Sequence, residues 1–148
     1  MSTTWLVHPD APRGQTFKPI GVGTTGASAL RAIVADDDAF VRERIRGALS
    51  EAPDIELIAT ARGGAEALRI ALELRPDVLV LDDNMPIVGG LAGLARLQSE
   101  APEIRVVMYV ESPGNCIDAA AMGAASCVIK GWPLDALVWA IRRTHVGT

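Results

Sequence analysis

From residue 32 onward, short apolar runs alternate with longer amphipathic stretches. Five runs are rich in apolar residues and short enough to be buried strands. They cover residues 32–35, 55–61, 78–81, 104–110 and 127–129. The run at 78–81 is continuously apolar, which is typical of a central parallel strand covered on both faces.

Each apolar run is followed by a stretch whose apolar residues recur at helical spacing. In residues 39–50, for example, Phe40, Val41 and Ile45 lie on the face opposite a series of arginines. The predicted helices cover residues 39–50, 65–74, 91–98, 117–122 and 134–145. Strict alternation of strands and helices predicts an α/β fold, a five-stranded parallel sheet with helices on both faces.

Residues 1–30 differ from the rest of the chain in composition and in hydrophobic patterning. They hold three charged residues, three prolines, four glycines and five threonines, and show no sustained periodicity. Such a segment does not provide the apolar surface that folding requires. We therefore expect a flexible extension at 1–30 and a single folded domain at 31–148.

Ionisable residues follow three of the predicted strands at the point where each strand ends. Asp36, Asp37 and Asp38 follow the first strand, Asp82 and Asp83 the third, and Lys130 the fifth. In parallel sheets, sites form at the carboxyl ends of the strands. Clustered carboxylates repel one another unless a cation lies among them, and oxygen ligands favour Mg²⁺ or Ca²⁺. This arrangement predicts phosphoryl chemistry, with a solvated acidic loop as the alternative.

The basic residues of the chain are almost all arginines. Lys18 and Lys130 are the two lysines, and Lys130 alone lies in the predicted domain. A lysine ammonium is a compact point charge that can reach one phosphoryl oxygen in a tight cleft, whereas a guanidinium is broad and planar. Lys130 is therefore predicted to be a site residue, although a lysine that merely caps a strand is the alternative.

Composition excludes several classes of protein. The 148 residues include 14 basic and 18 acidic side chains, for a net charge of −4, which argues against direct binding of nucleic acid. The two cysteines, Cys116 and Cys127, are too few for a disulfide framework and lack metal-ligand spacing. There is neither a membrane-length apolar run nor a secretory leader pattern. A reducing, cytoplasmic setting is expected.

Three segments together resemble the receiver domain of two-component response regulators. They are RAIVADDDAFVR at 31–42, PDVLVLDDNMP at 76–86 and GAASCVIK at 123–130. The resemblance covers residues 31 to about 146 and implies the flavodoxin-like (βα)5 fold of that family. Residues 134–147 also look like the last helix of receivers that precede a LuxR-type DNA-binding domain.

The resemblance implies a role for each matching position. Asp82 would be the phosphoacceptor, and Asp36, Asp37 and the backbone carbonyl of Asn84 would hold Mg²⁺ beside it. Lys130 would pair with the phosphoryl group. The donor would be a histidine kinase or a phosphotransfer protein, and catalysis would be limited to self-phosphorylation and dephosphorylation rather than the activity of an enzyme.

The chain departs from the family at both positions that usually transmit phosphorylation. Val110 stands where a threonine or serine is usual, and Cys127 where a tyrosine or phenylalanine is usual. Valine cannot donate a hydrogen bond, so the contact that normally distinguishes the two states is missing. We therefore expect phosphorylation of Asp82 with weakened or rewired coupling to a DNA-binding output domain.

Two other functions stay open. One is a phosphorylation-independent interaction or dimerisation module, which Val110 and Cys127 favour and to which Trp132 and Trp139 would contribute a homodimer contact. The other is a magnesium-dependent phosphohydrolase, against which stands Asn84 in place of a second general acid.

Overall fold

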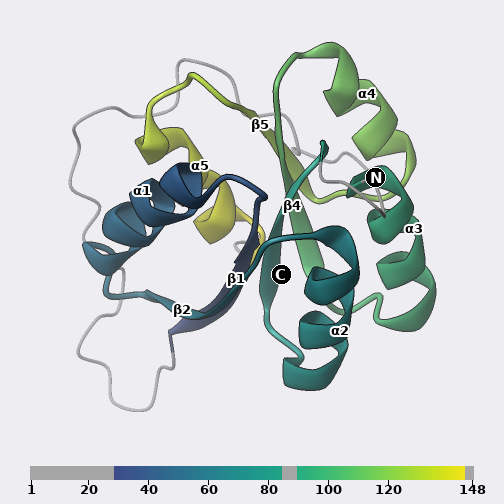
Figure 1. Ribbon diagram of the computed structural model, residues 1–148, viewed down its shortest axis with the longest axis horizontal. Helices are drawn as coiled ribbons and strands as arrows, with labels where there is room; N and C mark the ends of the chain where they lie inside the picture. Colours follow the sequence, from purple (N-terminus) through teal and green to yellow (C-terminus); the bar gives the residue numbers. More distant parts are fainter. Residues whose placement is uncertain (1–28, 85–89, 146–148) are drawn as a thin grey trace.

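The computed structural model describes residues 29–84 and 90–145. Most of the predicted extension at 1–30 lies outside the described residues. Within them, five strands and five helices alternate along the chain (Figure 1). In chain order they are β1 (Leu30–Ala35), α1 (Ala39–Ser50), β2 (Ile55–Ala61), α2 (Gly64–Leu74), β3 (Val78–Asp82), α3 (Gly90–Glu100), β4 (Arg105–Val110), α4 (Gly114–Ala121), β5 (Ser126–Ile129) and α5 (Leu134–Arg143). The predicted α/β class is confirmed.

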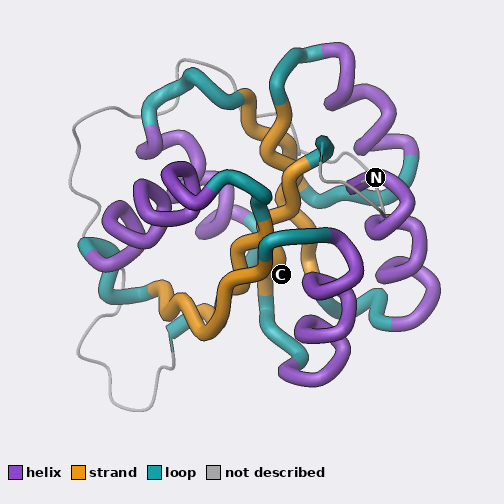
Figure 2. The backbone as a smooth tube through the Cα atoms, in the orientation of Figure 1, coloured by secondary structure: helices purple, strands orange, loops and turns teal. Residues whose placement is uncertain are grey.

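The five strands form one parallel sheet in the order β2-β1-β3-β4-β5. All five residues of β3 are buried, as expected for the central strand. Helices α1 and α5 cover one face of the sheet, and α2, α3 and α4 cover the other (Figures 1 and 2). Because all strands run in the same direction, their carboxyl ends share one edge, and the predicted site residues lie there.

Alternate residues of each strand supply the cores on the two faces. In β1, Ile33 and Ala35 pack with α2, α3 and α4, whereas Ala32 and Val34 pack with α1 and α5. All four are at most 1% exposed. A sheet that is buried on both faces in this way holds the residues after its strands on a rigid base.

Several predicted bounds are wrong by a few residues. Strand β1 begins at Leu30, inside the predicted extension, because the backbone N–H of Leu30 donates to the carbonyl of Asp54 at 2.9 Å. Helix α4 begins at Gly114 rather than at 117, since Pro113 at its N-cap has helical dihedral angles. Gly114 and Asn115 are weak helix formers, so sequence alone placed the helix start too late.

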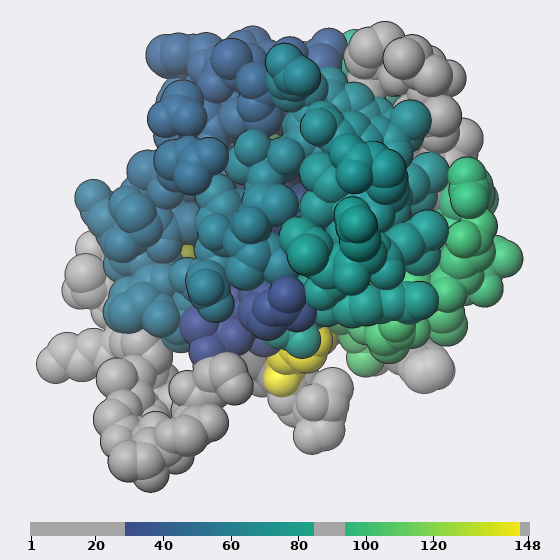
Figure 3. Space-filling view, turned by 60° about the horizontal axis from the view of Figure 1, so that its bottom comes forward, coloured from purple at the N-terminus to yellow at the C-terminus, as the bar shows by residue number. Residues whose placement is uncertain are grey.

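The edge of the sheet opposite the predicted site joins the start of β2 to the end of α5. The guanidinium of Arg142 donates two hydrogen bonds to the carboxylate of Asp54, at 2.7 and 2.9 Å. Figure 3 shows the first residues of β1, in purple, close to the last described residues of α5, in yellow. The two ends of the described domain therefore meet at this edge, away from the predicted site.

Candidate functional site

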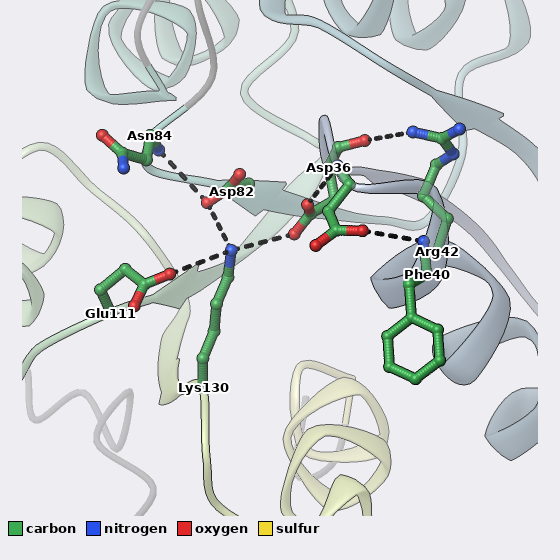
Figure 4. Close-up of polar contacts among 8 residues, drawn as sticks. Asp36, Phe40, Arg42, Asp82, Asn84, Glu111 and Lys130 are labelled. Atoms are coloured by element: carbon green, nitrogen blue, oxygen red, sulfur yellow. Dashed lines mark hydrogen bonds and ion pairs between the residues drawn. The ribbon is translucent and has the colours of Figure 1, made fainter.

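Four ionisable side chains from four strand ends converge at the carboxyl edge of the sheet. Asp36 follows β1, Asp82 ends β3, Glu111 follows β4 and Lys130 follows β5. Figure 4 shows the ammonium of Lys130 between the carboxylates of the other three. The Nζ atom lies 2.9 Å from Asp82 Oδ1, 3.1 Å from Asp36 Oδ2 and 3.8 Å from Glu111 Oε2.

Asp36 is fixed in place by its neighbours in sequence. Its Oδ1 atom accepts a 2.9 Å hydrogen bond from the backbone N–H of Asp38, and its carbonyl accepts one of 2.8 Å from Arg42 (Figure 4). Asp38 in turn caps α1 by accepting from the N–H of Phe40. The sequence predicted that acidic residues cluster here, but it did not predict that Asp38 caps helix α1.

Burial and mutual repulsion oppose ionisation of the two inner carboxyl groups. Asp36 and Asp82 are each 1% exposed. Burial raises the pKa of Asp82 above its ordinary value, and contact with Lys130 offsets only part of this rise. The pKa of Asp36 is likewise raised, first by burial and further by the charge of Asp82.

In contrast to the two carboxyl groups, Lys130 is favoured in its charged form. Burial alone would lower the pKa of its ammonium, but the carboxylates of Asp82 and Asp36 outweigh that effect and hold the pKa well above its ordinary value. The ammonium also lies 5.6 Å from the centre of the Tyr109 ring. Lys130 is therefore charged at neutral pH, and it holds Asp82 Oδ1 in one position.

The carboxylate cluster has the donor set of a hard divalent cation. One oxygen each from Asp36, Asp37 and Asp82 lies within 4.8 Å of the others. Asp82 Oδ2 is buried and has no hydrogen-bond partner among the described residues. An unpaired buried carboxylate oxygen beside two further carboxylates fits a Mg²⁺ ligand. The backbone N–H of Asn84 donates to Asp82 Oδ1 at 3.2 Å, and the role of its carbonyl stays a prediction.

The two atypical positions lie in neighbouring strands, two residues apart in register. Val110 ends β4 and Cys127 lies in β5, and both are fully buried. A disulfide joins Cys127 to Cys116 in α4. The sequence placed Cys127 in a predicted buried strand but did not predict that it meets Cys116, because a separation of 11 residues does not reveal which faces the two residues share.

Two polar contacts of the site were missed by sequence reasoning. The side-chain amide of Asn115 in α4 donates to Oδ2 of Asp83, the residue after Asp82. Glu111 lies beside Lys130 although the sequence analysis gave it no role. Its position directly after β4, at the same edge as the predicted site, is the feature that could have identified it.

Comparison with known proteins then identifies the family. Residues 32–142 match the response regulator receiver domain. The chain belongs to the receiver domain family. This assignment confirms the predicted resemblance, and the receiver fold with its carboxylate cluster accounts for the strand-end residues described above.

The relatives of this receiver domain carry different output functions. The transcriptional regulatory protein LnrK of Bacillus subtilis (strain 168) is 32% identical over 120 residues, which are 80% of this chain and 54% of LnrK. A protein-glutamate methylesterase/protein-glutamine glutaminase of Geobacillus kaustophilus (strain HTA426) is 38% identical over 123 residues, 80% of this chain and 35% of the relative. The chain thus spans about half of the first relative and a third of the second.

Solved receiver structures have the same fold. The receiver domain of the putative response regulator NarL from Mycobacterium tuberculosis aligns with a TM-score of 0.76 at 28% identity, covering 82% of this chain and 99% of that one. The response regulator domain of Thermotoga maritima CheB aligns with a TM-score of 0.74 at 29% identity, covering 81% and 99%. In the described part of the receiver, no helix is long and apolar enough to cross a membrane.

Proposed function

We propose that this receiver domain accepts a phosphoryl group on Asp82, with Mg²⁺ held by Asp36, Asp37, Asp82 and the carbonyl of Asn84. The contrast between the two oxygens of Asp82 carries the proposal. Oδ1 is held by Lys130 at 2.9 Å, whereas Oδ2 is buried and lacks a hydrogen-bond partner among the described residues. Lys130 thus orients the carboxylate, and its unpaired oxygen leaves it free to interact with an incoming cation or phosphoryl group.

In the proposed transfer, a carboxylate oxygen of Asp82 attacks the phosphorus atom of the donor. A new O–P bond forms as the bond between phosphorus and the donor's leaving atom breaks, and the leaving group takes that electron pair. Lys130 keeps the carboxylate oriented and then pairs with an oxygen of the transferred group. Mg²⁺, when bound, supplies positive charge to the phosphoryl oxygens.

The donor class and the output are part of the same proposal. A histidine kinase or a phosphotransfer protein would supply the phosphoryl group in the cytoplasm, and catalysis would be limited to phosphorylation and dephosphorylation of Asp82. The output would be control of transcription through a DNA-binding domain, which the similarity to LnrK supports. The receiver, at 31–148, would itself not bind nucleic acid, given its acidic residues.

A homodimer through α5 is also part of the proposal. Trp132 and Trp139 are half-buried and pack against the core beneath α1 and α5. Arg143 lies 5.0 Å from the ring centre of Trp139. Their partly exposed rings would be the apolar centre of a contact between two copies.

Incubation with acetyl phosphate and Mg²⁺, followed by intact-mass measurement, tests the phosphoacceptor role. The expected result is one added phosphoryl group in the wild type and none in Asp82→Asn. Asp118→Asn, which removes an exposed carboxylate from α4, is the matched control and should still be modified. No addition to the wild type would contradict the proposal, and steady release of phosphate without a modified chain would indicate a phosphohydrolase.

A phosphorylation-independent interaction module is the second candidate. The fully buried side chain of Val110 favours it, because this position lacks a hydroxyl that could follow a phosphoryl group. In such a module the acidic cluster would bind a metal ion or would be the remnant of a former phosphorylation site. The same mass measurement separates the two candidates, since an interaction module need not take up a phosphoryl group.

A further inference from the structure

The disulfide between Cys116 and Cys127 ties a helix to the strand that precedes Lys130. Cys116 is the third residue of α4, and Cys127 is the second residue of β5. Their Cα atoms are 5.6 Å apart, within the range that a disulfide bridges without backbone movement. The bond closes a short loop that contains the rest of α4 and the turn into β5.

The bond lies in the core on the face covered by α2, α3 and α4. Cys116 is 2% exposed and Cys127 is fully buried. Cys127 pairs with Met108 in the register of β4 and β5, two residues before Val110. The disulfide therefore ties α4 to Cys127, one of the two atypical positions, which lies two register positions from the other, Val110.

The route by which a reagent reaches this bond is the first turn of α4. Residues 111–114, which lead into the helix, are all exposed, and Ile117 is 70% exposed. Cys116 lies between these exposed positions, and its own backbone N–H bonds locally, to the carbonyl of Pro113 at 3.0 Å. Local opening of this one turn would uncover Cys116 without disrupting the sheet.

We propose that Cys116 and Cys127 are a redox-modification site whose reactants are small disulfides and thiols of the glutathione class. In a compartment that keeps thiols reduced, a disulfide of this kind forms and breaks as a regulatory event rather than a permanent staple. The oxidised site fixes the first turn of α4 to β5, and the reduced site releases it.

Formation of the bond is a two-step thiol–disulfide exchange. The thiolate of Cys116 attacks one sulfur of the small disulfide, forms a mixed disulfide and releases one thiolate. The thiolate of Cys127 then attacks the sulfur of Cys116, forms the internal bond and releases the second thiolate. The two cysteine protons pass to the two released thiolates, so two cysteines are oxidised and one small disulfide is reduced to two thiols.

Two contacts extend the effect of the bond to the site. Asn115, next to Cys116, donates to the Asp83 carboxylate beside Asp82. Glu111, at the start of the exposed segment, contacts Lys130. Release of the first turn of α4 would loosen the segment that carries both residues. The oxidation state of the cysteines would thus change the surroundings of Asp82 without any change in the sheet.

The redox state can be measured on the full chain without a phosphoryl donor, so its outcome is independent of the proposed phosphorylation. The protein is equilibrated in glutathione buffers from fully reduced to fully oxidised, quenched in acid, and treated with N-ethylmaleimide in denaturant. The expected intact masses change from two adducts per chain to none across this range. Persistent labelling in the oxidised buffer, persistence of the bond in the reduced buffer, or accumulation of a glutathione adduct would each overturn the proposal.

Hydrogen exchange then tests the effect on α4. Reduction of the wild type should accelerate exchange of the backbone amides in 111–122 on the order of tenfold or more, because the short closed loop is released. The amides of β1 and β3 are the internal control and should not change. Equal exchange in both buffers would overturn the proposed lock.

The double variant Cys116→Ala/Cys127→Ala should show fast exchange in both buffers. If this variant does not fold, the comparison of oxidised and reduced wild type still decides the question, since both states come from the same protein.

Discussion

At the residue scale, the notable feature of the site is an excess of negative charge around one ammonium. Asp36, Asp82 and Glu111 all lie within 3.8 Å of Lys130 Nζ. The inner two are 1% exposed, whereas the Glu111 side chain is 65% exposed. Glu111 is thus the outermost carboxylate, on the solvent side of the contact between Lys130 and Asp82.

Replacement of Glu111 by Gln should accelerate phosphorylation of Asp82. The substitution removes a charge that repels an anionic donor and that competes for Lys130. Because Glu111 is exposed and screened by solvent, the expected gain is modest, roughly two- to fivefold in the rate with acetyl phosphate at low salt. The measurement is the time course of phosphorylated chain by intact mass.

Two controls accompany this measurement. Glu103→Gln removes an exposed acid that pairs with Arg75 instead, and should leave the rate unchanged. The gain from Glu111→Gln should also shrink as salt increases. A slower reaction in Glu111→Gln would show that this carboxylate assists Lys130 rather than competing for it.

At the element scale, helix α4 is joined to the site through a polar contact rather than through a hydroxyl at the end of β4. The amide of Asn115 bonds Asp83, which follows Asp82 directly. Asp83 Oδ1 is buried and has no hydrogen-bond partner among the described residues, whereas Oδ2 accepts from Asn115. The segment after β3 and the start of α4 are thus linked even though position 110 is a valine.

Substitution of Asn115 by Ala should break this link. Loss of a hydrogen bond to a partly buried carboxylate costs about 1–2 kcal/mol of unfolding free energy. Urea unfolding measures the loss, and hydrogen exchange should show faster exchange at the start of α4. Asp118→Asn, an exposed change in the same helix, is the control. Unchanged stability in Asn115→Ala would mean that water replaces the amide at no cost.

A second inter-element link should make stability depend on pH. Burial acts to raise the pKa of Asp54, but the guanidinium of Arg142 outweighs it and holds that pKa below its ordinary value. The ionised pair therefore stabilises the fold above the unfolded pKa of Asp, about 3.9, and this contribution is lost as the pH falls through the lower, folded pKa.

Asp54→Asn should consequently lower the unfolding free energy by about 1–2 kcal/mol at pH 7, and by progressively less below pH about 4. Urea unfolding across this pH range measures the difference. Glu103→Gln breaks the more exposed pair with Arg75 and should cost less than about 1 kcal/mol at pH 7. Equal losses in the two variants would contradict the idea that the two-bond contact with Asp54 joins α5 to β2.

At the scale of the whole molecule, the arrangement of strands was predictable and the contacts between elements were not. Apolar runs and helical periodicity predict five strands and five helices, and parallel pairing then brings Asp36, Asp82 and Lys130 to one edge. The contacts of Glu111 with Lys130 and of Cys116 with Cys127 depend on how loops and helix faces meet in space. Sequence spacing does not contain that information.

Ionisation of the buried acidic cluster should also lower the free energy of unfolding. Because the pKa of Asp82 is raised by burial, its ionised form is less favourable in the folded state than in the unfolded state. Stability is therefore lost as the pH rises from the unfolded pKa, about 3.9, to the higher folded pKa, and the deficit persists above it. A carboxylate kept at the expense of stability is typical of a functional site.

Asp82→Asn should accordingly raise the unfolding free energy by about 1 kcal/mol at pH 7 in a chelating buffer. Lys130 keeps its contact with Asp36 in this variant, so the ammonium is not left unpaired. Below pH about 3.9 the difference should vanish, because the wild-type carboxyl is then protonated in both states. Urea unfolding of both chains across this pH range gives the comparison, with Asp118→Asn as the control for loss of one exposed charge.

Mg²⁺ should narrow the difference in unfolding free energy between the wild type and Asp82→Asn. A cation that binds only the folded state stabilises the wild type. Once its concentration exceeds the dissociation constant, this stabilisation grows with the logarithm of the concentration. A variant that lacks one ligand responds less. Wild type and Asp82→Asn should therefore converge as Mg²⁺ is added, while Asp118→Asn follows the wild type. If Asp82→Asn were the less stable chain in chelator, contact with Lys130 would outweigh burial and repulsion at Asp82. If Mg²⁺ stabilised both chains equally, the cation would not bind at this carboxylate.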